Sequence, residues 1–232
     1  MLAEAGIRGV NGADAPQRLA LVLGDSHAAV FEGLRLPVQG VADAQGFEVC
    51  SVGGATASGL ENPNSATHAR ERFVQALAAQ PCQDVVVLLG EVDTGFVIWH
   101  RAQTRGIPVL DSLDQTLCTY TGFLDELARS RRVWVLSAPL PTIQDGQSWG
   151  EVANLRREVR ASLFERTQLT LMFNNAVAEH ARRNAMRHVN LDPHSIGGDR
   201  LVRDALRSRD PLDHHYDRTA FQALIRAHGP WR

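Results

Sequence analysis

The sequence predicts an α/β fold in which a mostly parallel sheet lies between two layers of helices. Five short apolar runs, each rich in valine or leucine, recur along the chain without strict polar alternation, as expected of strands that are covered on both faces. Amphipathic stretches separate these runs, and strands that alternate with helices require crossover connections that make neighbouring strands parallel. The predicted strands are residues 19–23, 47–52, 84–89, 132–137 and 188–191.

The helices are predicted from apolar residues that recur at one-turn spacing between these runs. Residues 28–36 follow the first run with a helix-like pattern, and Phe73 and Leu77 stand one turn apart before the third run. Longer apolar stripes follow the third and fourth runs. Their members are Leu113, Leu117, Tyr120, Leu124 and Leu127 in the first stripe, and Leu155, Val159, Leu163, Leu169, Phe173 and Val177 in the second.

The size of the chain favours one domain. With 232 residues and 44% hydrophobic content, the protein can bury one substantial core. We therefore expect a single domain over residues 18–232. Residues 1–17 are rich in alanine, glycine and aspartate and are expected to form a loose leader. The sequence does not indicate an oligomeric state.

The charge balance argues against a polyanionic partner. Lys and Arg number 24 against 26 Asp and Glu, for a net charge of −2, which gives no electrostatic basis for binding nucleic acid or an anionic membrane. No segment approaches the roughly 20 apolar residues of a membrane span. Three cysteines without a paired spacing favour a reducing compartment, so we predict a cytoplasmic protein with a small polar ligand.

The unusual residues of the chain cluster where the predicted strands end. Ser26 follows the first strand, and residues 53–56, 90–93 and 138–141 follow the next three. Ligands of parallel α/β sheets bind outside the carboxyl ends of the strands. These four loops therefore predict one site at one edge of the sheet.

The sequence Gly24-Asp25-Ser26-His27 predicts a turn that presents a small nucleophile at this edge. Ser26 is the candidate nucleophile, and Asp25 fits the role of a turn and helix-cap residue. A serine hydroxyl is a weak nucleophile at neutral pH and requires a nearby base. The C-terminal segment 210–216 offers His214 and His215.

Together these blocks resemble the SGNH (GDSL-type) hydrolase superfamily of esterases, lipases and carbohydrate deacetylases. The resemblance rests on Gly24-Asp25-Ser26, on Gly54-Ala55-Thr56 and on the C-terminal histidine block. It implies a flavodoxin-like three-layer α/β/α fold with a five-stranded sheet. It also implies that Ser26 is the nucleophile and that the backbone N–H groups of Ser26 and Gly54 bind the oxyanion.

The third block departs from the superfamily pattern Gly-x-Asn-Asp. This chain reads Gly90-Glu91-Val92-Asp93, and valine cannot supply the side-chain amide that serves as a third oxyanion donor. The loss of one such donor typically costs about 100- to 1000-fold in rate. Asn62 and Asn64 are candidate substitutes.

The fourth block departs from the pattern Asp-x-x-His, because neither histidine has an aspartate three residues before it. We predict His215 as the general base, since Tyr216-Asp217 resembles the residues that follow the superfamily's histidine, and His214 remains the alternative. Asp213 is predicted to orient the imidazole, and Asp210 is the other available carboxylate.

The variant blocks are similar to those of SGNH-like proteins associated with surface polysaccharide biosynthesis. That resemblance implies an acylated sugar or a related carbohydrate as substrate. His27, Glu91 and Asp93 would then bind polar groups of the substrate. Buried carboxylates need a partner, so Glu91 and Asp93 could instead pair with an arginine such as Arg101.

The sequence thus predicts a serine esterase that forms an acyl-serine intermediate and needs no cofactor or metal. An acyltransferase would use the same intermediate. Two alternatives stay open: a non-catalytic carbohydrate-binding module on a hydrolase fold, and a metal-dependent phosphoesterase. The metal ligands of the latter would be Asp25, His27, Glu91, Asp93, His214 and His215.

Overall fold

The computed structural model describes residues 18–37, 44–146 and 159–229, and the predicted leader lies outside these ranges. A single sheet runs through the molecule with strand order β2-β3-β1-β4-β5-β6. Its strands are β1 (Arg18–Gly24), β2 (Leu36–Pro37), β3 (Ala44–Ser51), β4 (Asp84–Leu88), β5 (Arg132–Leu136) and β6 (Arg187–Val189).

The five predicted strands are confirmed, and they pair in parallel throughout. Their order along the sheet reverses between β1 and β4, as in flavodoxin-like folds, and this reversal opens a crevice at the carboxyl edge. The short strand β2 was not predicted. It pairs antiparallel with β3 at the edge of the sheet, a position that tolerates Pro37 because proline has no N–H to donate.

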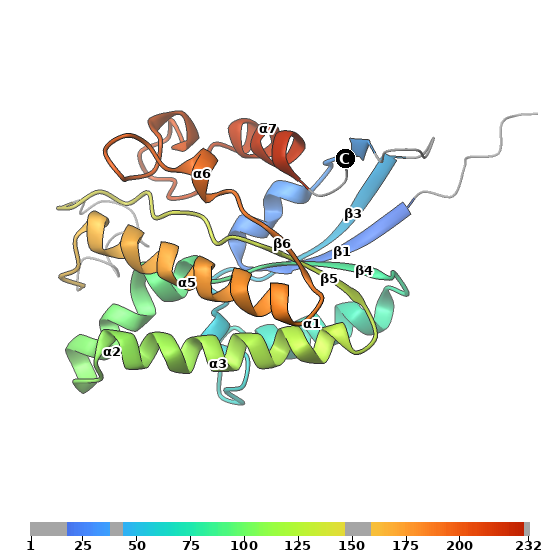
Figure 1. The fold of residues 1–232 in the computed structure, drawn as a ribbon, viewed down its shortest axis with the longest axis horizontal. Helices are drawn as coiled ribbons and strands as arrows, with labels where there is room; N and C mark the ends of the chain where they lie inside the picture. The colour runs from blue at the N-terminus through green and yellow to red at the C-terminus, as the bar shows by residue number, and fades with distance from the viewer. Residues whose placement is uncertain (1–17, 38–43, 147–158, 230–232) are drawn as a thin grey trace, which may run out of the picture.

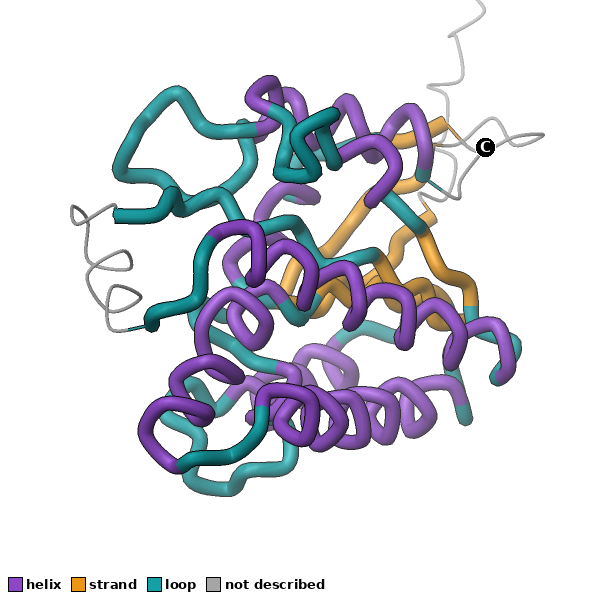
Figure 2. The backbone as a smooth tube through the Cα atoms, turned by 60° about the vertical axis from the view of Figure 1, so that its left-hand side comes forward, coloured by secondary structure: helices purple, strands orange, loops and turns teal. Residues whose placement is uncertain are grey.

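Helices cover both faces of the sheet (Figures 1 and 2). Figure 1 shows α6 and α7 on one side of the strands and α1 and α3 on the other. The predicted helix over residues 28–36 is instead a short 3-10 helix. No helix in the described ranges is long and apolar enough to cross a membrane. The helical elements are η1 (Ser26–Phe31), η2 (Ala57–Gly59), α1 (Ala69–Ala79), η3 (Asp93–Val97), α2 (Ile98–Arg105), α3 (Val109–Ala128), α5 (Leu163–Arg183), α6 (Asp192–Ser195), η4 (Asp204–Leu206) and α7 (Arg218–His228).

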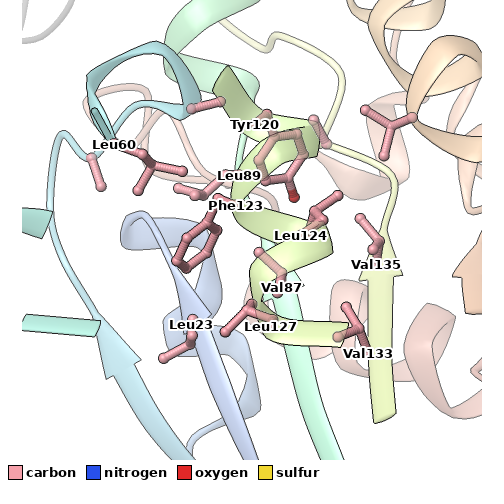
Figure 3. Close-up of a cluster of buried hydrophobic side chains, with 14 of the residues drawn as sticks. Leu23, Leu60, Val87, Leu89, Tyr120, Phe123, Leu124, Leu127, Val133 and Val135 are labelled. Atoms are coloured by element: carbon pink, nitrogen blue, oxygen red, sulfur yellow. The ribbon is translucent and has the colours of Figure 1, made fainter. Parts of the chain in front are cut away.

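Alternate residues of each central strand enter two separate cores. Leu23 of β1 and Val87 of β4 pack with α3 residues such as Leu124 in the first core (Figure 3). Val22 and Leu88, their neighbours along the same strands, lie in the second core with residues of η1 and α7. Double burial explains why these strands appear in the sequence as continuous apolar runs.

Two glycines allow close packing at the carboxyl edge. A Cβ on Gly24 would lie 2.4 Å from the Leu88 carbonyl oxygen, so glycine lets the end of β1 lie against β4. Gly90 has a φ of +125°, and a Cβ there would lie 2.4 Å from Phe173 of α5. Both turns that leave the central strands therefore require glycine.

Side-chain hydrogen bonds connect neighbouring loops at this edge. Ser51 Oγ at the end of β3 donates to the Asp25 carbonyl at 2.8 Å. The Asp93 carboxylate accepts from the backbone N–H groups of Ala57 at 2.7 Å and Ser58 at 3.0 Å. Burial raises the pKa of Asp93 to about 6, although these hydrogen bonds and the charge of Arg101 oppose the shift. Asp93 therefore anchors η2 to the exit of β4.

We expect Asp93→Asn to lower the free energy of unfolding by about 1–3 kcal/mol near pH 7, because one backbone N–H loses its acceptor. The unfolded carboxyl releases its proton at its ordinary pKa, whereas the folded one holds it to about pH 6. This group's stabilising contribution is thus present at low pH and is lost as the pH rises through 6.

Urea denaturation of both proteins between about pH 4 and pH 8 measures this contribution. The gap in unfolding free energy between wild type and variant should narrow by up to about 3 kcal/mol as the pH rises to 6, and then stay constant. A gap that is the same at every pH would show that the pKa of Asp93 is not raised.

Candidate active site

Ser26, His215 and Asp213 form a continuous chain of hydrogen bonds. Ser26 Oγ lies 2.8 Å from His215 Nε2, and His215 Nδ1 lies 2.6 Å from Asp213 Oδ1. Ser26 occupies the first position of η1, directly after β1, while the other two residues precede α7. The fold thus places a hydroxyl, an imidazole and a carboxylate in the order that nucleophilic catalysis requires.

Asp213 selects His215 through a local turn. Its Oδ1 accepts from the His215 backbone N–H at 3.0 Å as well as from the ring. Partial burial alone would raise the pKa of Asp213, but the hydrogen bonds from His215 and the charge of its ring lower the pKa overall. Asp210 is exposed and accepts from the Leu212 N–H, so it shapes the preceding turn.

The loop after β5 holds the segment that carries His215. The Leu140 backbone N–H donates to the Tyr216 hydroxyl at 2.8 Å, and Thr142 Oγ1 donates to the His214 carbonyl at 2.5 Å. Tyr216 is buried, and burial raises the pKa of its hydroxyl. Both neighbours of His215 are therefore fixed by the same loop.

Asp25 and His27 repeat the geometry of Asp213 and His215. Asp25 Oδ1 accepts from the His27 backbone N–H at 2.9 Å and lies 3.1 Å from His27 Nδ1. Both residues are buried, and the ring centroids of His27 and His215 are 4.7 Å apart. Asp25 thus caps η1 and fixes the His27 ring beside His215.

The residues predicted to bind the oxyanion differ in exposure: Ser26 is half-buried, whereas Gly54, Asn62 and Asn64 are exposed. No described residue accepts a hydrogen bond from the backbone N–H of Ser26 or Gly54, and Gly54 has a φ of +71° on an exposed turn. Asn62 and Asn64 are also exposed, and Asn62 Oδ1 accepts from the Asn64 N–H. Like Gly54, neither asparagine lines the cavity beside Ser26.

Glu91 and Asp93 are both buried at the exit of β4. Asp93 binds the backbone of η2, as described above. Burial raises the pKa of Asp93 and outweighs the positive charge of Arg101, which lowers this pKa without a direct ion pair between the two side chains. Burial is the main cause of the raised pKa of Tyr216, and the charges of Asp192 and Glu91 add to it. Neither acid lines the cavity at Ser26.

A half-open cavity of about 440 Å³ lies beside the Ser26–His215 pair. Ala29, Val30 and Phe221 give it an apolar wall, and the rest of the lining is mostly polar. The volume falls in the range of small-molecule sites. The polar side of the cavity and its reacting groups are Ser26, His27, Ser208, Asp213, His215, Tyr216, Asp217 and Arg218.

Of the six residues in the metal alternative, Asp25, His27, His214 and His215 lie together, whereas the Asp93 carboxylate binds the backbone of η2. Among the described residues, Asp213, His214 and His215 form the only group of three or more His, Cys, Asp or Glu side chains whose ligand atoms all lie within 4.8 Å of one another. Both ring nitrogens of His215 are already engaged by Ser26 and Asp213. The Asp25 carboxylate accepts a hydrogen bond from the His27 backbone N–H, and the Asp93 carboxylate accepts one from the Ala57 backbone N–H.

Two buried polar residues at the carboxyl edge, Asn174 and Asp192, were not predicted from the sequence. Asn174 on α5 bonds both backbone groups of Ala138 and donates to Asp192 at 2.9 Å. Burial raises the pKa of Asp192 to about 6, with hydrogen bonds from Asn174 and Ser137 opposing the shift. The sequence did contain an indication for Asp192, because this residue follows the last predicted strand at the edge where the site was expected. Asn174 carries no such signal, since it stands inside an apolar helical stripe.

Comparison with known proteins shows the fold. No protein-family model and no curated protein matches the sequence. Among solved structures, a GDSL-like lipase from Bacteroides thetaiotaomicron is similar with a TM-score of 0.56 and 16% identity, over 90% of this chain and 86% of that chain. An extracellular lipase from Streptomyces rimosus has a TM-score of 0.50 and 12% identity, over 91% and 99% of the two chains.

An acetyl xylan esterase, AlAXEase, is similar with a TM-score of 0.51 and 15% identity, over 88% of this chain and 97% of that chain. These structures match almost the whole described architecture. The chain therefore has the three-layer fold of GDSL-like lipases and esterases, as the sequence predicts.

Proposed function

We propose that this protein is a serine esterase that removes or transfers a small acyl group on a carbohydrate. The observation that carries the proposal is the 2.8 Å contact between Ser26 Oγ and His215 Nε2, with Asp213 on the far side of the ring. A non-catalytic binding module has no need of this contact. A metal-dependent phosphoesterase would not need the serine.

The geometry supports a two-step acyl transfer. Ser26 Oγ attacks the acyl carbonyl carbon while its proton passes to His215 Nε2, and Asp213 stabilises the imidazolium that forms. The tetrahedral oxyanion accepts from the N–H groups of Ser26 and Gly54. The intermediate then breaks its bond to the alcohol oxygen, which takes the proton from His215 and leaves an acyl-Ser26 ester.

The second step reverses these roles. Water, or a sugar hydroxyl in the transferase version, gives its proton to His215 Nε2 and attacks the acyl carbon, and Ser26 leaves with that proton. The half-open cavity of about 440 Å³ exceeds the size of an acetyl group and has room for a sugar ring beside it. Its polar side suits carbohydrate hydroxyls. The acetyl xylan esterase of the same fold and the similarity of the variant blocks to polysaccharide-biosynthesis proteins support this substrate class.

Labelling with a fluorophosphonate probe tests the nucleophile. We expect the wild type to be labelled covalently and Ser26→Ala not to be labelled, with a loss of at least about 10,000-fold in ester hydrolysis. Ser130→Ala is the matched control, because Ser130 is an exposed serine before β5 at the opposite edge of the sheet. It should react like the wild type.

A folded wild type that resists the probe would overturn the mechanism. Activity that survives in Ser26→Ala but disappears with a chelator would instead favour the metal-dependent phosphoesterase. The unfolding midpoints of both variants should match that of the wild type, since neither substitution removes buried apolar volume.

Substitution of the two adjacent histidines identifies the base. His215→Gln should reduce the rate about 100- to 10,000-fold, the usual contribution of a general base. His214→Gln should change the rate by less than about tenfold, because Thr142 bonds the backbone carbonyl at this position and not the ring. Steady-state hydrolysis of a p-nitrophenyl ester measures both. A larger loss in His214→Gln would reverse the assignment.

Acetate release tests the substrate class. The wild type should release acetate from acetylated xylo-oligosaccharides, and Ser26→Ala should not. Mass spectrometry of added unacetylated oligosaccharides would detect transfer to a sugar hydroxyl. Hydrolysis of p-nitrophenyl acetate without either reaction on sugars would reject the carbohydrate substrate and leave the serine esterase intact.

A further inference from the structure

A second cavity, which shares no lining residue with the one at Ser26, lies between η2, α2 and α3. Its volume is about 260 Å³, and α2 contributes two arginines to its wall. Ser58 belongs to η2, and Gln115 and Thr119 belong to α3. The full lining is Ser58, Arg101, Arg105, Ile107, Gln115 and Thr119.

The polar lining supplies hydrogen-bond donors and no acid. Two guanidinium groups, one amide and two hydroxyls face a space that no carboxylate lines. The acidic residues of α3 closest in sequence, Asp111 and Asp114, are exposed and do not contribute to the wall. Two positive charges that share one cavity repel each other, and a bound anion removes this repulsion.

The two arginines differ in how they are held. Arg101 is half-buried, and its Nη2 donates to Ser58 Oγ at 3.1 Å. Arg105 lies at the end of α2 and forms no ion pair with any residue of the described ranges. One guanidinium is therefore fixed in position, while Arg105 is exposed and donates to no side chain of the described residues.

We propose that this cavity binds the oxyanion group of a small ligand, a carboxylate or a phosphate, between Arg101 and Arg105. Guanidinium groups bind both anions with two parallel hydrogen bonds, and the hydroxyls of Ser58 and Thr119 can serve the remaining oxygens. The volume admits a ligand larger than a free ion, such as an acidic sugar or a sugar phosphate.

The site is connected to the loop that carries Gly54. Ser58 contacts Arg101 through its side chain and Asp93 through its backbone N–H, and η2 begins three residues after Gly54. An anion on Arg101 therefore contacts the element that Asp93 anchors at the edge of the sheet. The inference does not depend on the esterase proposal, because binding can be measured without turnover.

Isothermal titration calorimetry at constant ionic strength tests the site, with inorganic phosphate in one arm and succinate in the other. We expect at least one anion to bind the wild type, and the arm with the tighter binding identifies the group that the cavity prefers. Arg105→Ala should weaken binding about ten- to a hundredfold, the effect of losing a charge-assisted contact. Gln115→Ala, on α3, provides a second test from the opposite wall and should also weaken binding.

Two control variants show whether anion binding is specific to this cavity. Arg182→Ala removes an exposed arginine of α5 that pairs with Glu179, and it should bind like the wild type. Ser26→Ala should also bind like the wild type, even if the esterase proposal fails. Absence of binding by both anions, or equal losses in Arg105→Ala and Arg182→Ala, would overturn the proposed site. Binding that is unchanged in Arg105→Ala and Gln115→Ala would do so as well.

Discussion

The hydrogen bond between Ser26 Oγ and His215 Nε2 joins residues 189 positions apart, and the carboxyl edge of the sheet is organised around it. One end depends on Gly24, which lets β1 end against the Leu88 carbonyl. The other end depends on Leu140 and Thr142, which hold the residues on both sides of the histidine. A displacement of either strand exit by about 1 Å would break the contact, because hydrogen bonds weaken steeply with distance and angle.

The sequence predicted those parts of the fold that residues close together in the chain determine. The central strands β1, β4 and β5 were recognisable because burial on both faces demands apolar residues at nearly every position, whereas two-residue β2 is too short to leave a pattern. The contact of Ser26 with His215 and not His214 also has a local cause, although the prediction of His215 rested on the resemblance of Tyr216-Asp217. Asp213 accepts from the backbone two residues on, so its carboxylate meets the ring of the second histidine. Asp25 and His27 follow the same rule.

Contacts that join distant loops through the backbone left no trace in the sequence. Asp93 was expected to meet substrate or an arginine, yet its carboxylate binds the N–H groups of Ala57 and Ser58. Any residue except proline would offer the same donors at those two positions, so no pattern could identify them. The third oxyanion donor is a different case. No described asparagine or glutamine lines the cavity at Ser26, so the proposed mechanism relies on two backbone donors, of which Ser26 lines the cavity and Gly54 does not.

Three carboxylates at this edge show how environment assigns roles to chemically equal groups. Asp93 and Asp192 are buried, their pKa values rise to about 6, and they hold loops through neutral donors. Asp213 is partly exposed, with a side chain 39% accessible, and its pKa is lowered. Only the last remains ionised over the whole range in which an adjacent imidazole changes charge. A carboxylate that must stabilise an imidazolium has to keep its charge when the ring gains a proton, and among these three only Asp213 contacts such a ring.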